Sequence, residues 1–126
     1  MKRTGLGLVA AMLLCAGAAQ AAEPAMMMNS SAGKVWTDSK GMTLYTYDKD
    51  SMGKSDCYGK CAVNWPPLKA SASAKASGNW SVVKRKGGGA MWAYDGKPLY
   101  TFIGDKKPGD VNGDGKAGVW HVAKAE

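Results

Sequence analysis

The chain has 126 residues, 45% of them hydrophobic, and a formal net charge of +7 at neutral pH. A chain of this length forms one small domain with a modest hydrophobic core, which excludes a multidomain architecture. The excess of lysine favours anionic surfaces, such as the cell envelope, as partners. The lysines are scattered among glycine and serine, which argues against nucleic-acid binding.

The first 21 residues have the features of a secretory signal peptide. Lys2-Arg3 form a basic start, residues 6–18 form an uncharged apolar run, and Ala19-Gln20-Ala21 supply small residues for a cleavage site. The run is too short for a stable membrane span, and an uncleaved anchor is the alternative. We expect cleavage after Ala21 and a soluble periplasmic protein with a charge of about +5.

Two segments without periodicity frame the expected domain, residues 34–126. Residues 22–33 are rich in Ala, Met and Ser, which indicates a mobile, Met-rich tail. Residues 69–79 are a low-complexity run of small residues and indicate a linker. The linker separates repeat one, residues 34–68, from repeat two, residues 80–123.

Short β-strands are expected on both sides of this linker, because residues of alternating polarity lie between turn formers. Gly87-Gly88-Gly89 is typical of a turn, and Asp95-Gly96 is a strong two-residue hairpin signal. One helical turn is expected near residues 57–64, ended by Pro66-Pro67. The expected strands are Val35–Thr37, Met42–Tyr47, Trp80–Arg85, Met91–Tyr94, Pro98–Phe102 and Val119–Val122.

The two halves contain the same motif at an offset of 55 residues. Tyr45-Thr46-Tyr47-Asp48-Lys49-Asp50 reappears as Tyr100-Thr101-Phe102-Ile103-Gly104-Asp105, and a tryptophan, Trp65 or Trp120, follows each aspartate after 15 residues. One repeat of about 45 residues is marginal alone, so the two are expected to bury aromatic faces against each other. The fold class is therefore all-β, a small single domain of two tandem, pseudo-equivalent β repeats with Gly-rich loops.

These residues resemble the bacterial secreted-repeat proteins, often lipoproteins, that are described by a Tyr-x-aromatic-x-x-Asp motif. Besides the two motif copies, the similarity includes Cys57-Tyr58-Gly59-Lys60-Cys61 and Tyr94-Asp95-Gly96-Lys97-Pro98, and it covers about residues 33–123. It implies an exported tandem-repeat module and carries no established activity. The chain departs from the lipoprotein members because a large residue, Leu14, precedes Cys15 where lipidation needs a small one.

Export leaves Cys57 and Cys61 in an oxidising compartment, where a disulfide is the default. Their spacing can be bridged by a tight turn and matches neither the redox Cys-x-x-Cys motif nor the haem signature. So short a loop would shape residues 57–65 more than it would stabilise the whole fold. The alternative is a thiol pair that binds a soft metal.

The motif aspartates, Asp50 and Asp105, follow the motif strands. An aspartate there accepts hydrogen bonds from loop amides two or three residues on, and we favour this role over a functional carboxylate at a shared rim. The aromatic residues are expected in the core, with a stacking platform for a sugar or flat ligand as the alternative. They are Tyr45, Tyr47, Trp65, Tyr100, Phe102 and Trp120, together with Trp36, Trp80 and Trp92.

Two segments carry atoms that metals bind. The consecutive Met26, Met27 and Met28 offer thioether sulfurs that suit Cu(I), although alternate spacing would suit chelation better. The run with Asp110, Asn112 and Asp114 matches the first half of a calcium loop. The twelfth position of that loop is His121 instead of glutamate, so an ordinary polar turn is the favoured interpretation.

No catalytic constellation is visible in the sequence. His121 is the one histidine, and no nucleophile signature stands beside it. We expect a non-catalytic periplasmic binding or scaffold module, monomeric, without a cofactor and with an unknown ligand. The alternative is a periplasmic protein that handles Cu(I) or Ca²⁺.

The signal-peptide interpretation predicts the mass of the exported protein. Intact-mass spectrometry is expected to find a chain that begins at Ala22, because the small residues before it suit signal peptidase. A mature species that retains residues 1–21 would contradict this prediction.

Overall fold

The computed structural model describes residues 24–125, and the predicted signal peptide and Cys15 lie outside this range. Within it, short strands and one helical turn confirm the expected all-β class. No helix among the described residues is long and apolar enough to cross a membrane. The strands are β2 (Met26–Ser30), β3 (Gly33–Thr37), β4 (Tyr45–Tyr47), β5 (Lys69–Ala70), β6 (Trp80–Lys84), β7 (Ala90–Tyr94), β8 (Lys97–Pro98) and β9 (Trp120–Val122); the helices are α1 (Lys60–Asn64) and the 3-10 turn η2 (Lys116–Gly118).

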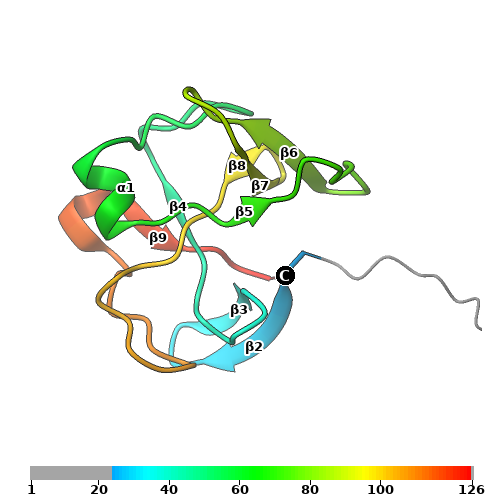
Figure 1. Ribbon diagram of the computed structural model, residues 1–126. Helices are drawn as coiled ribbons and strands as arrows, with labels where there is room; N and C mark the ends of the chain where they lie inside the picture. The colour runs from blue at the N-terminus through cyan, green and yellow to red at the C-terminus, as the bar shows by residue number, and fades with distance from the viewer. Residues whose placement is uncertain (1–23, 126) are drawn as a thin grey trace, which may run out of the picture.

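These strands form three small antiparallel sheets (Figure 1). β2 pairs with β3, β4 pairs with β9, and β7 lies between β5 and β6 with β8 also paired to it. Figure 1 shows the hairpin of β2 and β3 at one end of the molecule and the sheet of β5 to β8 at the other. β4 runs between them, so the central pair of β4 and β9 connects the two outer sheets.

The turn between β7 and β8 follows directly from the sequence. Asp95 and Gly96 both have positive φ angles, 52° and 80°, which a two-residue hairpin turn of mirror-image type requires. The strand expected over Pro98–Phe102 is shorter than the alternation suggested. Within residues 99–102 Tyr100 alone makes isolated bridges, one of them to Pro67, and proline has no N–H to extend a ladder.

Residues 26–30 form β2, which corrects the prediction of a mobile tail over residues 22–33. β2 pairs with β3 along five residues, and the Ser30 hydroxyl donates to the Gly33 carbonyl at 2.8 Å across the turn. Met26 and Met27 remain exposed, so backbone pairing holds the strand in place. Its sequence shows no alternation of apolar and polar residues, and for that reason the strand was not predicted. The first repeat therefore begins near residue 26 instead of residue 34.

Each repeat completes the sheet of the other. The end of repeat two pairs with repeat one, where Trp36 donates its N–H to the Ala123 carbonyl at 2.9 Å. The end of repeat one pairs with repeat two, where Trp92 donates to the Leu68 carbonyl at 2.8 Å. β9 and β5 are parts of these exchanged ends, and neither repeat has its full set of backbone partners without the other.

Aromatic rings fill the space where the repeats meet. Trp65 and Trp120 are 6% and 5% exposed, and their rings stack 3.8 Å apart at an interplanar angle of 3°. Tyr47 stacks on Trp120 and Phe102 stacks on Trp65, each at 4.2 Å. The prediction that the motif tryptophans belong to the core is correct.

Truncating either stacked tryptophan should destabilise the protein strongly. Trp65→Ala and Trp120→Ala are each expected to lower the free energy of unfolding by ~3–5 kcal/mol, because each leaves a cavity inside the aromatic stack. Urea denaturation of the mature protein measures this loss, and Met52→Ala, at a side chain 73% exposed, is the control that should change little. A loss below ~1 kcal/mol for a tryptophan variant would refute its role as a core residue.

Candidate functional site

The motif tyrosines and aspartates are exchanged between the repeats. The Tyr45 hydroxyl donates to Asp105 at 2.7 Å, and the Tyr100 hydroxyl donates to Asp50 at 2.6 Å. Each motif tyrosine therefore binds the aspartate of the other repeat. The tyrosines also face each other along the backbone, where each N–H donates to the other's carbonyl, at 2.7 and 3.0 Å.

The second oxygen of each aspartate holds a loop in place. Asp50 accepts from the Asp56 N–H at 2.7 Å, and Asp105 accepts from the Asn112 N–H at 2.9 Å. The prediction of amide capping is correct in kind, but the amides lie six and seven residues on because the loops fold back. The hydrogen bond that each aspartate accepts from a tyrosine was not predicted, because that tyrosine lies in the other half of the chain.

Both phenols are buried, and burial sets their protonation. Burial, followed by the hydrogen bond to a carboxylate, raises the pKa values of Tyr45 and Tyr100 well above the ordinary value. Burial also raises the pKa of Asp50, while its hydrogen bonds from Tyr100 and Asp56 oppose this rise. Gly113 approaches Tyr45 so closely that a Cβ there would lie 3.0 Å from the phenol ring carbon.

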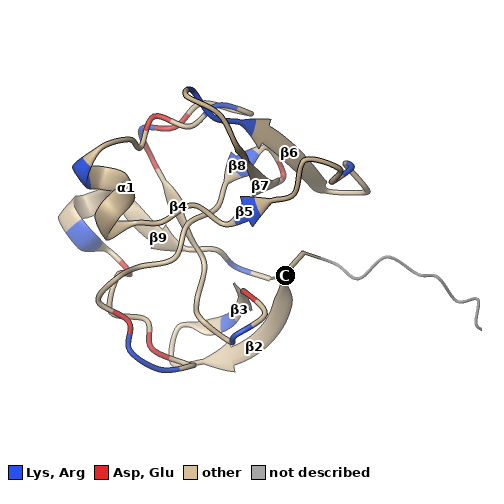
Figure 2. Cartoon of the chain, in the orientation of Figure 1, with Lys and Arg blue, Asp and Glu red and all other residues tan. Residues whose placement is uncertain are grey.

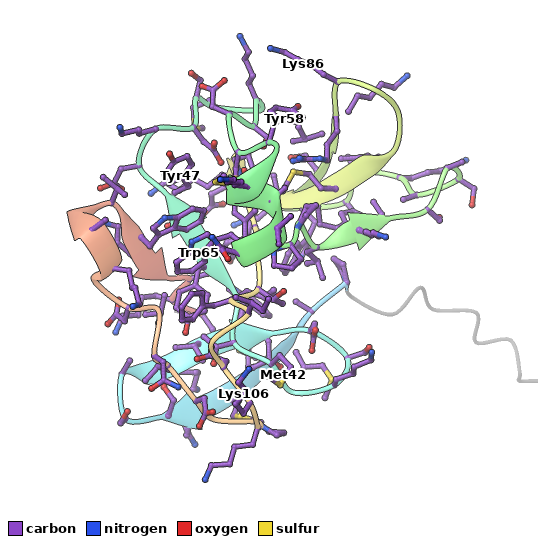
Figure 3. The ribbon with its side chains drawn as sticks, turned by 60° about the vertical axis from the view of Figure 1, so that its left-hand side comes forward. Met42, Tyr47, Tyr58, Trp65, Lys86 and Lys106 are labelled. Carbon is purple, nitrogen blue, oxygen red and sulfur yellow. A yellow bond between two sulfur atoms is a disulfide. The ribbon has the colours of Figure 1, made fainter. Side chains whose placement is uncertain are left out.

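Cys57 and Cys61 form the expected disulfide, with Cα atoms 5.3 Å apart. The bridged loop is tied to repeat two by Arg85, which donates to the Cys57 carbonyl at 2.7 Å and to the Ser55 hydroxyl at 2.9 Å. The Arg85 guanidinium also lies 4.3 Å from the ring centre of Tyr58. Figure 3 shows Tyr58 near Lys86, and the Lys86 N–H donates to the Tyr58 hydroxyl at 3.0 Å.

The methionines proposed for Cu(I) lie along β2. Side chains alternate between the two faces of a strand, so Met27 lies on the face opposite Met26 and Met28. Met28 lies close to Gly41, the residue before Met42. The strand does not aim its three sulfurs at one point, and copper binding stays a prediction.

The residues proposed for calcium each stabilise the loop they belong to. Asp110 accepts from the Lys106 and Lys107 N–H groups, and Asp114 accepts from the Val122 N–H. The Asn112 amide donates to the Gly104 carbonyl at 3.4 Å. Among residues 24–125, no three His, Cys, Asp or Glu side chains gather as a metal site would require.

His121 lies on β9 and is exposed. Its Nε2 atom lies 2.9 Å from an Asp48 carboxylate oxygen. Both side chains are about half exposed, so the pair contributes little to stability.

A pocket of about 690 Å³ lies between the linker and a second aromatic cluster. Four aromatic residues line it, Trp36 from β3, Trp80 from β6, and Trp92 and Tyr94 from β7. Trp36 lies 5.0 Å from Trp80 and 5.1 Å from Tyr94 between ring centres. The volume of the pocket falls within the range of roughly 300–1,000 Å³ that small-molecule sites occupy.

Residues of the linker also line this pocket. Residues 69–70 of the predicted linker are strand β5, and residues 71–79 form the loop between β5 and β6 in Figure 1. The loop is held by reciprocal backbone hydrogen bonds between Ser77 and Trp80 at 2.9 Å. These tryptophans were expected in the core, with a stacking platform for a sugar or flat ligand as the alternative. The part of residues 71–79 in a pocket was not predicted, because their low-complexity sequence carries no local binding motif.

The chain belongs to the family described as a secreted repeat of unknown function. The family model matches residues 26–69 and 81–124, two tandem copies that together span more than half of the chain. The match confirms the tandem-repeat architecture and supports export. No curated protein and no solved structure matches the chain.

The two buried phenols should resist alkaline titration. The native absorbance step of tyrosinate is expected to fall short of the step in unfolded protein by two tyrosines, because Tyr45 and Tyr100 stay protonated. Their native pKa values exceed the unfolded value of about 10. Their contribution to stability is therefore complete below that pH and is lost as the pH rises through the native pKa values.

The variants Tyr45→Phe and Tyr100→Phe test the assignment. Each should reduce the absorbance step of the unfolded protein by one tyrosine and leave the native step unchanged. A reduced native step would show that the substituted phenol titrates in the folded protein.

Proposed function

We propose that this protein is a non-catalytic binding module of the periplasm, and that its ligand is a small neutral saccharide held in the aromatic pocket. The observation that carries the proposal is the set of four aromatic residues on one wall of a pocket of suitable size. The family's description as secreted and the disulfide between Cys57 and Cys61 support action in an exported, oxidising compartment.

The aromatic wall offers ring faces to a ligand. Trp36 and Trp80 are buried, whereas Trp92 and Tyr94 are half-buried and retain accessible ring surface. Trp80 and Tyr94 pack at 4.7 Å between ring centres, which holds the Tyr94 ring in place. Rigid aromatic rings contribute large contact area at low cost in conformational entropy.

The polar wall selects the charge and chemistry of the ligand. Residues 71–79 provide the hydroxyls of Ser71, Ser73 and Ser77 and the amide of Asn79, with Lys75 as their one charged residue. Figure 2 shows this loop mostly in tan, with blue for its lysine and no red. Hydroxyl and amide groups donate and accept hydrogen bonds, as sugar hydroxyls do.

One buried donor near this pocket also lacks a partner. The Trp36 Nε1–H makes no hydrogen bond within the described residues. An unpaired buried donor costs ~1–3 kcal/mol. The Nε1 atom is enclosed by protein, so this cost belongs to the fold and the donor is not presented to a ligand in the pocket.

The proposal predicts saturable saccharide binding at the pocket. Isothermal titration calorimetry and tryptophan fluorescence with neutral glucose and N-acetylglucosamine oligosaccharides are expected to detect it in the mature protein. Trp92→Ala should weaken the affinity at least ~10-fold, the effect of losing one stacking contact of ~1.4 kcal/mol. Asn79→Ala should weaken it less, because it removes hydrogen-bonding groups alone.

Tyr58→Ala is the matched control, since Tyr58 is a half-buried aromatic residue outside the pocket. It should leave the affinity unchanged, with the melting temperature of each variant recorded as a test of folding. Equal affinity in the wild type and Trp92→Ala would place the ligand elsewhere. An absence of binding across the oligosaccharides would overturn the saccharide assignment.

A further inference from the structure

Four aromatic rings form one continuous column where the repeats meet. The order is Tyr47, Trp120, Trp65 and Phe102, with ring centres 4.2, 3.8 and 4.2 Å apart. The rings alternate between the repeats, and the equivalent positions of the two repeats occupy equivalent places in the column. Figure 3 shows Tyr47 and Trp65 in the region where β4 and α1 meet.

Two more rings contact the middle of this column edge-on. Tyr45 lies 5.3 Å from Trp65 at 81°, and Tyr100 lies 5.3 Å from Trp120 at 89°. Both tyrosines are fully buried, and each donates its phenolic hydrogen to a carboxylate, Asp105 or Asp50. Each buried phenol thus touches an indole on one side and a proton acceptor on the other.

This arrangement has a chemical consequence for oxidation. Two parallel indoles in contact share the positive charge that remains when one electron is removed, which makes that removal easier than from an isolated ring. A phenol loses an electron readily when its proton can leave at the same time. The carboxylates at 2.6 and 2.7 Å are placed to take that proton.

We propose that this aromatic cluster is a one-electron relay that accepts oxidising equivalents from peroxide-derived radicals. The radical gains one electron, and the Trp65–Trp120 pair becomes a radical cation. Tyr45 then passes one electron to Trp65 and its phenolic proton to Asp105. The phenol O–H bond breaks, an O–H bond forms on the carboxyl group, the indole pair returns to its neutral state, and a tyrosyl radical remains.

The second half of the cluster performs the same step through Tyr100, Trp120 and Asp50. A comparison of the repeats separates this role from packing. Position 47 has a hydroxyl and its equivalent, Phe102, has none, so the column tolerates either ring. Positions 45 and 100 both carry the hydroxyl and both reach a carboxylate.

The test uses electron paramagnetic resonance on a variant with two tyrosines. Tyr47→Phe, Tyr58→Phe and Tyr94→Phe together leave Tyr45 and Tyr100 as the only tyrosines of the five in the chain. Photogenerated tris(bipyridine)ruthenium(III) is the oxidant, and samples are frozen after the flash. A tyrosyl radical signal is expected from this variant.

Adding Asp50→Asn and Asp105→Asn should abolish the tyrosyl signal and leave an indole radical. Asparagine has a single acceptor oxygen, which can keep the phenolic hydrogen bond at the expense of the loop N–H that the second carboxylate oxygen holds. That oxygen is too weak a base to take the phenolic proton. Asp50→Asn alone should halve the tyrosyl radical signal. This single variant keeps the test decisive if the double variant does not fold. Asp95→Asn, at an exposed turn position, is the control and should change nothing.

Two outcomes would overturn the relay. A two-tyrosine variant that yields only indole radicals would show that the buried phenols do not donate electrons to the column. An undiminished tyrosyl signal in the Asp50→Asn and Asp105→Asn variants would show that the carboxylates do not accept the phenolic proton and act in packing alone.

Discussion

The fold depends on a reciprocal hydrogen bond in which the tyrosine of each repeat reaches the aspartate of the other. Both Tyr45–Asp105 and Tyr100–Asp50 are charge-assisted bonds in a largely water-excluded interior, where such bonds are strong and an unpaired partner is costly. The pairing joins residues 60 and 50 positions apart in the chain. It explains why an isolated motif copy would have no partner.

Exchange of backbone strands extends the same constraint to the whole domain. The end of repeat one supplies β5 to the sheet of repeat two, and the end of repeat two reaches back to β3 and β4. The aromatic column sits between these exchanged ends. The repeats are thus two halves of one cooperative unit. The linker connects them and lines the pocket.

The two aromatic assemblies differ in what surrounds them. The column of Tyr47, Trp120, Trp65 and Phe102 is packed between the repeats and flanked by buried phenol–carboxylate pairs. The cluster of Trp36, Trp80, Trp92 and Tyr94 faces a loop of small polar residues across an open volume. The first assembly therefore suits internal electron and proton movement, and the second suits contact with an external ligand.

The sequence by itself determined the local features, and only the tertiary structure decided how they combine. Alternating polarity predicted the strands, and the Asp95-Gly96 pair predicted the hairpin turn. The 55-residue offset predicted the repeats, and the spacing of the cysteines allowed the disulfide. Each of these signals can be read directly from the order of residues in the chain. The Tyr–Asp exchange and the pocket depend on partners that lie far away in the sequence. β2 pairs with its neighbour β3, but its residues lack the alternation of buried and polar positions by which a strand is recognised. Met26 and Met27 form a strand through backbone pairing with β3, and Asp50 and Asp105 acquire their phenols because the repeats exchange ends.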